Sequence, residues 1–174
     1  FDLGANQIKA LDTVDIAALS TSQIAQFKQD QIGQLTTDQV KALGTQQIQA
    51  LGASQIRGLT STQMSALSTA QLSALTTAQA KTLSATQVNA LSSAQIASME
   101  TVDVAALAGS TTSGLSTDSV KALSSDQVAT LNASQLRSLS ATQLNALDTA
   151  DLANMGTSQL VQLTADQVAG LSTG

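Results

Sequence analysis

The sequence has 174 residues and a net charge of -5, from seven basic and twelve acidic side chains. It contains no Cys, His or Pro, which excludes disulfides, thiolate metal sites and the commonest catalytic base. The acidic balance, without any basic stripe, argues against nucleic acid as a partner. No apolar run approaches the roughly 20 residues of a transmembrane helix, so we expect no membrane insertion.

An apolar residue recurs at every eighth position along almost the whole chain. A second apolar column follows three residues after the first and runs from Leu11 to Leu171, with Phe27, Met99 and Met155 as substitutes. Only Thr112 is polar in the first column. Such a fixed short period is the signature of a repeat architecture. The first column comprises Ile8, Ile16, Ile24, Ile32, Val40, Ile48, Ile56, Met64, Leu72, Ala80, Val88, Ile96, Val104, Val120, Val128, Leu136, Leu144, Leu152, Leu160 and Val168.

Each octad also carries the signals of a helix start. The residue after each leucine is almost always Ser, Thr, Asp, Asn or Gly, the types preferred at a helix N-cap, and Gln stands three places further on. Ser/Thr-x-x-Gln is a capping box, and the leucine before it and the apolar residue after it form a hydrophobic staple. We therefore assign a structural capping role to the Gln column, represented by Gln23, Gln39, Gln71, Gln87, Gln95, Gln127 and Gln143.

The charged residues agree with this frame. Acidic side chains are favourable near the positive N-terminal end of a helix and basic ones beyond it. All acids except Asp2 fall in the cap or first turn of an octad, and all bases except Lys28 follow the first apolar column. This sorting favours short helices over strands.

In chain order, the octads are regular except at two places. After Thr13–Leu19 comes the irregular Phe27-Lys28, and after the similar Thr101–Leu107 comes the segment 108–115, which lacks the cap, the Gln and the apolar residue. We expect a weak or absent helix at 108–115. The two similar units lie eleven octads apart, so this segment is interpreted as the junction of a super-repeat of about 88 residues within one domain, 1–174.

Geometry argues against one continuous helix, because eight residues at about 100° each overshoot two turns by about 80° and the apolar stripe would circle the helix. The sequence thus predicts an all-α solenoid of about 21 tandem octapeptide repeats, each a very short capped helix. A β-solenoid is the alternative, although apolar spacings of three and five do not alternate with period two.

No catalytic, cofactor-binding or metal-ligating motif emerges. The acids stand singly, without the dense spacing of a calcium loop, and there is no nucleophile elbow, phosphate loop or zinc spacing. We expect a protein that is not an enzyme and uses no cofactor or metal.

Two nine-residue units, LTTDQVKAL at Leu35–Leu43 and LSTAQLSAL at Leu67–Leu75, resemble the "LTTxQVxAL" repeats of very large proteobacterial surface proteins, often described as haemagglutinin- or adhesin-like. The resemblance covers nearly the whole chain. It implies an extracellular or cell-surface location in a bacterium, and a stalk or filament segment whose adhesive chemistry lies elsewhere in the polypeptide.

The expected function is a structural spacer or fibre-forming segment. Its open ends expose leucines, so the expected partners are further copies, end to end or side by side, or flanking repeats of the same chain. The chain enters and leaves the repeat in mid-array, so we expect it to be an excerpt of a longer one. The alternative is a binding module whose Ser, Thr and Gln columns meet a regular ligand such as ice or a polysaccharide.

Overall fold

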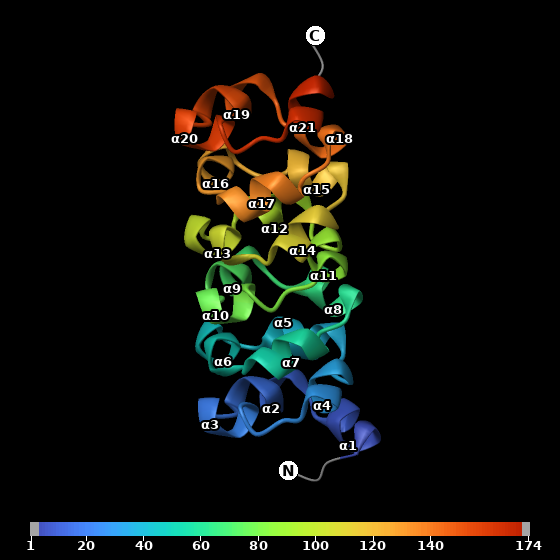
Figure 1. The fold of residues 1–174 in the computed structure, drawn as a ribbon. Coiled ribbons are helices and arrows are strands. Elements are labelled where there is room, and N and C mark those ends of the chain that lie inside the picture. Colours follow the sequence, from blue (N-terminus) through green and yellow to red (C-terminus); the bar gives the residue numbers. More distant parts are fainter. Residues whose placement is uncertain (1–3, 172–174) are drawn as a thin grey trace.

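The computed structural model describes residues 4–171 and shows an all-α solenoid (Figure 1). The helices stack into a column with the two ends of the chain at opposite ends of it. Residues 4–171 contain no strand, so the β-solenoid alternative is wrong. The helices are α1 (Ala5–Ala10), α2 (Thr13–Ala18), α3 (Thr21–Ile24), α4 (Gln29–Gly33), α5 (Thr37–Ala42), α6 (Thr45–Ala50), α7 (Ala53–Gly58), α8 (Ser61–Ala66), α9 (Thr69–Ser73), α10 (Thr77–Ala80), α11 (Ala85–Asn89), α12 (Ser93–Ala97), α13 (Thr101–Ala106), α14 (Gly109–Ser113), α15 (Thr117–Lys121), α16 (Ser125–Ala129), α17 (Ala133–Ser138), α18 (Ala141–Leu144), α19 (Thr149–Asn154), α20 (Thr157–Leu160) and α21 (Ala165–Ala169).

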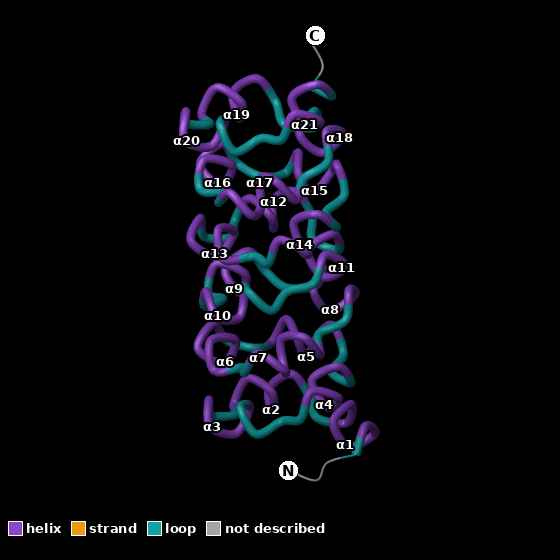
Figure 2. The backbone as a smooth tube through the Cα atoms, in the orientation of Figure 1, coloured by secondary structure: helices purple, strands orange, loops and turns teal. Residues whose placement is uncertain are grey.

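Each helix ends at the leucine of its octad or shortly before it. At the end of α8, Leu67 is extended, with φ -61° and ψ 140°, while its N–H donates to the Met64 carbonyl at 3.2 Å. Ser68 follows immediately and caps α9. The chain therefore bends once per octad, within the few residues between two helices, and Figure 2 shows short helices joined by short loops along the whole column.

The two apolar columns form one continuous core along the axis. Ile56, Leu72 and Leu136 of the first column are all 0% exposed, and Leu43 and Leu67 of the second are each 3% exposed. Most helices pack against the helix three places further along, as α2 does on α5 and α4 on α7. Because a helix of four to six residues is too short to be stable alone, this stacking is what holds each octad in shape.

One turn of the superhelix takes between three and four octads. Helices three octads apart are in contact, and side-chain hydrogen bonds between turns join residues 25 to 31 positions apart. A turn therefore contains a non-integral number of octads, and successive octads occupy different positions around the column.

A longer spacing of seven octads appears where successive turns approach most closely. A Cβ placed on Gly58, Gly114 or Gly170 would lie 2.5, 2.7 and 2.5 Å, respectively, from an atom of the preceding turn. These glycines recur at intervals of seven octads, and Asn89 and Asn145 are separated by the same interval. Two turns of about three and a half octads each would account for this spacing. The super-repeat of eleven octads stays a prediction.

The expectation that residues 108–115 form no helix is wrong, because α14 occupies Gly109–Ser113; that this helix is a weak one stays a prediction. The backbone N–H groups of Thr111 and Thr112 both donate to the Ala108 carbonyl, at 2.9 and 3.0 Å. The Thr112 hydroxyl also donates to Ala108 at 3.2 Å, so the polar side chain in the apolar column is paired although it is 2% exposed. Packing against neighbouring turns and the kept octad spacing override the missing cap.

None of the helices within residues 4–171 combines the length and the apolar composition needed to cross a bilayer.

Candidate functional site: the glutamine ladder

The glutamine at the third position of each helix caps its own helix. In the octad of α9, the Ser68 hydroxyl accepts a hydrogen bond from the Gln71 N–H at 3.1 Å, and Gln71 Oε1 accepts from the Ser68 N–H at 2.8 Å. Two backbone donors that a helix start leaves without intrahelical partners are thereby satisfied. Where the cap is glycine, as at Gly44 and Gly52, only the Gln half remains, with N···Oε1 distances of 2.7 Å.

The same side chain also reaches the preceding turn. Gln71 Nε2 donates to the Val40 carbonyl at 2.8 Å and to the Leu43 carbonyl at 2.7 Å, which lie 31 and 28 residues earlier. These two carbonyls lie at the end of α5, where the last C=O groups of a helix lack intrahelical partners. One amide therefore links the start of one helix to the end of another in the turn before.

This arrangement recurs along the column, and we call it the glutamine ladder. In each case one Nε2 donates to the carbonyls 31 and 28 residues earlier, at 2.6 to 3.2 Å; the members are Gln39, Gln47, Gln55, Gln63, Gln71, Gln79, Gln87, Gln127, Gln135, Gln143, Gln159 and Gln167.

The glutamines singled out from the sequence occupy two environments. Gln23, in the first turn, is exposed and makes only the cap bonds with Ser20, at 2.8 and 3.2 Å, among its hydrogen bonds to described residues. Gln95 donates to Leu67 at 2.6 Å and to Ser65 instead of the residue 31 positions earlier. The rest are buried and combine both roles, namely Gln39, Gln71, Gln87, Gln127 and Gln143.

Sequence reasoning found the cap and missed the bonds between turns. The acceptors are backbone carbonyls, which carry no sequence signal, so only the position of the Gln could be read. It also missed Asn89 and Asn145, which donate to the Gly114 and Gly170 carbonyls of the next turn at 3.0 and 2.9 Å. The recurrence of this Asn and Gly pair after seven octads was the available signal.

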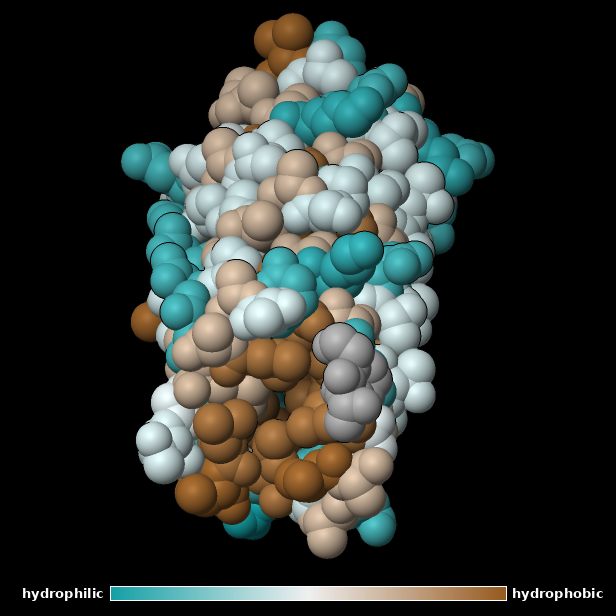
Figure 3. Space-filling model, turned by 90° about the horizontal axis from the view of Figure 1, so that it is seen from above, coloured by the Kyte–Doolittle hydropathy of each residue, from teal (hydrophilic) through white to brown (hydrophobic). Residues whose placement is uncertain are grey.

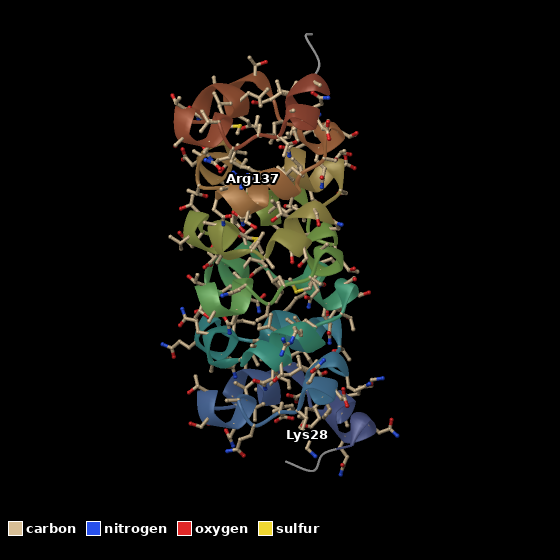
Figure 4. All side chains as sticks on the ribbon, in the orientation of Figure 1. Lys28 and Arg137 are labelled. Carbon is tan, nitrogen blue, oxygen red and sulfur yellow. The ribbon has the colours of Figure 1, made fainter. Side chains whose placement is uncertain are left out.

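An arginine makes a comparable bond between turns on the surface. Arg137, labelled in Figure 4, donates through its Nη2 to Gln162 Oε1 at 2.6 Å and through its Nε to the Gln162 carbonyl at 3.3 Å. These bonds are exposed, so the buried ladder is the main polar connection between turns.

The ladder is interrupted at four octads. Asp103, Thr111 and Ser119 replace Gln in three successive octads, and Asp151 replaces it once more. Asp151 still caps its helix through Asp148 and accepts from the Ser125 hydroxyl at 2.8 Å. An ionised carboxylate at this position has no donor, and a hydroxyl has a single donor hydrogen, so neither can replace the amide that donates to two carbonyls of the preceding turn.

Asp103 is the electrostatically unusual member. Its side chain is 2% exposed, and its Oδ2 is the one buried side-chain N or O atom of the described residues that has no hydrogen-bond partner. Desolvation by burial raises the pKa of Asp103; the hydrogen bond from Thr77 opposes this shift and the nearby Glu100 adds to it. The Asp103 carboxylate thus lies at the position where regular octads have a Gln amide that donates to backbone carbonyls of the preceding turn.

The described residues contain no group of three or more Asp, Glu, His or Cys side chains placed to hold a metal ion. The acids instead lie in the first turns of separate helices, such as Asp38 in α5 and Asp126 in α16, where they complement the helix dipole. What the arrangement does chemically is to pair backbone groups, along the column and between turns.

One family model, described as the ALTTAQ repeat, matches the chain five times, over residues 8–45, 37–69, 65–101, 96–133 and 144–174. A search of curated proteins finds no match.

Proposed function

This chain belongs to the ALTTAQ repeat family, and from that premise we propose that it acts as a stiff spacer, a repetitive structural segment that holds attached domains at a distance. The observation that carries this proposal is the glutamine ladder. It joins each turn to the one before with buried hydrogen bonds at both ends of the amide. A rod tied in this way resists bending and stretching without needing any further partner.

The wider setting of this proposal is a large bacterial surface protein, in which the spacer would extend an adhesive domain from the cell. Its support is the resemblance of Leu35–Leu43 and Leu67–Leu75 to repeats of such proteins. An antibody raised against the isolated chain tests the location. Antibody labelling of intact cells is expected, and labelling only after lysis would contradict it.

The glutamine ladder is directional, because each Gln amide donates to the preceding turn, and the two ends of the rod therefore present different groups to a partner. Gln7 and Gln23 are exposed in the first turn, while Leu160, Val161 and Val168 in the last helices are 45%, 69% and 54% exposed. Figure 3, which looks onto the C-terminal end, shows apolar surface gathered on part of that end. A cut between any two turns would create this pair of faces, one offering amides and the other carbonyls and apolar side chains. We propose that these faces associate end to end, with flanking turns or with a second copy.

The spacer is tested by length. Proteins made of one, two and three tandem copies of residues 4–171, which join Leu171 to the cap Gly4 and keep the octad register, should give rods whose length grows in proportion to copy number at constant width, as seen by small-angle scattering and electron microscopy. Compact particles, or a contour that is flexible along its whole length, would overturn the proposal. Light scattering of the single copy across concentrations separates end-to-end association from a monomeric rod.

A second candidate is a binding module that uses the repeated polar columns. The buried glutamines are not available for it, because Gln71 and its equivalents use both amide atoms within the solenoid. The Ser and Thr columns are exposed, as at Ser68, Thr69, Thr76 and Thr77, and they carry this candidate. Thermal hysteresis or polysaccharide retention by the isolated chain would favour it, and neither effect is expected of a spacer.

A further inference from the structure

The ladder is broken in three successive octads, at one level of the column. Below this level, Gln79 and Gln87 make both ladder bonds, and Gln95 makes the bond to the carbonyl 28 residues earlier; above it, the ladder resumes with Gln127, Gln135 and Gln143. Between them stand Asp103 on α13, Thr111 on α14 and Ser119 on α15. Figure 1 places α13 and α14 near the middle of the rod.

Few of the buried bonds between turns survive at this level. By the register of the ladder, these three positions face the carbonyls of Leu72, Leu75, Ala80, Leu83, Val88 and Leu91. Within the described residues, only Leu83 receives a side-chain hydrogen bond, from the Thr111 hydroxyl at 2.7 Å. Asp103 has only acceptors to offer these carbonyls when it is ionised, and its Oδ2 is left without a partner.

The replacement bonds lie nearer the solvent. Asn89 Oδ1 accepts from the Ser116 N–H at 2.8 Å and from the Ser119 hydroxyl at 2.9 Å, and its Nδ2 donates to the Gly114 carbonyl at 3.0 Å. These contacts are exposed or half-buried, so water competes for them more readily than for the buried amides.

The local helix starts are weak at the same level. Glu100 and Ala108, the caps of α13 and α14, make no side-chain cap bond, and neither helix has a capping box. Thr112 replaces an aliphatic side chain in the apolar column, which reduces the apolar surface buried there. The hydrogen bonds between turns and the helix caps are therefore poorer at α13 and α14 than in the regular octads, and the core is less apolar at α14.

We propose that the contact between α10–α11 and α13–α14 is a joint, at which the rod opens and bends first while the two flanking arms stay wound. This inference rests on the proposed spacer role and deepens it, since a stiff rod with one compliant level can reorient what it carries. The interruption at Asp151 does not form such a joint, because Gln143 and Gln159 flank it directly.

Amide hydrogen exchange of the full chain, followed by mass spectrometry, tests the joint. Peptides covering α10, α11, α13 and α14 should exchange by local opening at least about tenfold faster than those covering α5–α9, the scale of one to two net hydrogen bonds. The repaired variant D103Q/T111Q should slow this exchange to the level of the regular octads.

The matched control transplants the interruption. In Q71D/Q79T the same two residues enter successive regular octads, and Thr45 precedes position 71 by the same spacing by which Thr77 precedes Asp103. This variant should create a second fast-exchanging level at α5–α6 and α9–α10. Uniform exchange along the wild-type chain, or unchanged exchange at α13–α14 in the repaired variant, would overturn the joint. Hydrogen exchange reports local opening and not the length of the rod, so a result against the joint would leave the spacer proposal untouched. A rod that fails to lengthen with copy number would overturn the spacer proposal and would leave the exchange result at α13–α14 untouched.

Discussion

A glutamine side chain carries an acceptor and a two-proton donor on one planar group, and this chain uses both at once. Gln127, which is 1% exposed, accepts from the Ser124 N–H at 2.8 Å and donates to Ile96 and Met99 of the preceding turn. Glutamate would keep the acceptor and lose the donor, and asparagine would be one methylene too short to span the same gap. This dual demand explains why one residue type dominates the column.

Asp103 should make the stability of the chain depend on pH in an unusual direction. Its pKa in the folded state is raised above 3.8 by burial, so the folded state binds the proton more tightly than the unfolded state does. The destabilisation by its charge is therefore fully present above the raised pKa and disappears as the pH falls toward 3.8. Asp103→Asn should melt at a higher temperature than the wild type at pH 7.

The difference between Asp103→Asn and the wild type should shrink as the pH is lowered, since other carboxylates titrate alike in both proteins. Melting curves of the pair across this range measure it directly. A constant difference would mean that Asp103 is not the group responsible.

At the scale of the helix, each element depends on its neighbours. Helices of four to six residues lie below the length at which an isolated helix is stable. The N-cap bonds and the packing against neighbouring turns must therefore supply the stabilisation that helix propensity does not. The close contacts between turns fall at small residues. Gly58 in α7 has such a contact, since a Cβ there would lie 2.5 Å from the Gln29 carbonyl oxygen of α4.

Gly58→Ala should therefore destabilise the fold by about 1 to 3 kcal/mol, because the added methyl group forces α4 and α7 apart. Gly52→Ser is the control. Its Cβ would meet only the end of the Gln55 side chain, at 3.6 Å, and Ser is a preferred residue at the N-cap that Gly52 occupies, so this variant should not destabilise the fold. Urea unfolding of both variants checks this prediction, and equal effects would show that the crossing at Gly58 can relax.

At the scale of the molecule, equivalent octads imply that whole units can be removed. Deleting residues 60–67 joins Leu59 to Ser68, restores a leucine–cap junction and leaves every later Gln opposite an equivalent pair of carbonyls. Helicity per residue should be unchanged and the melting temperature lower by a few degrees. Deleting residues 60–63 removes half a unit and should abolish cooperative unfolding. Circular dichroism distinguishes the two, and similar behaviour of both deletions would refute the register.

Local structure was predictable from the sequence because its causes lie within eight residues. The spacing of Ser68 and Gln71 specifies a capping box wherever it occurs. The hydrogen bonds between turns were not predictable in the same way. Gln71 Nε2 comes within reach of the Val40 and Leu43 carbonyls only because the backbone bends at each leucine of the intervening octads. The helix at Gly109–Ser113 was missed because packing between turns outweighs a missing cap.

The central claim is that the Gln amide joins successive turns as well as capping its own helix. Gln71→Glu separates the two roles, because Oε can still accept from Ser68 while the donor to Val40 and Leu43 is lost. Gln23→Glu is the control, since Gln23 is exposed and bonds only to Ser20 among the described residues.

Urea midpoints of the two variants, followed by far-UV circular dichroism at pH 7, are the most direct measurement. Gln71→Glu should lower the free energy of unfolding by about 3 kcal/mol or more, because it leaves a buried charge facing two carbonyl oxygens. Gln23→Glu should change it by less than about 0.5 kcal/mol. Equal and small losses in both would show that the column only caps helices, and the ladder between turns would then have to be abandoned.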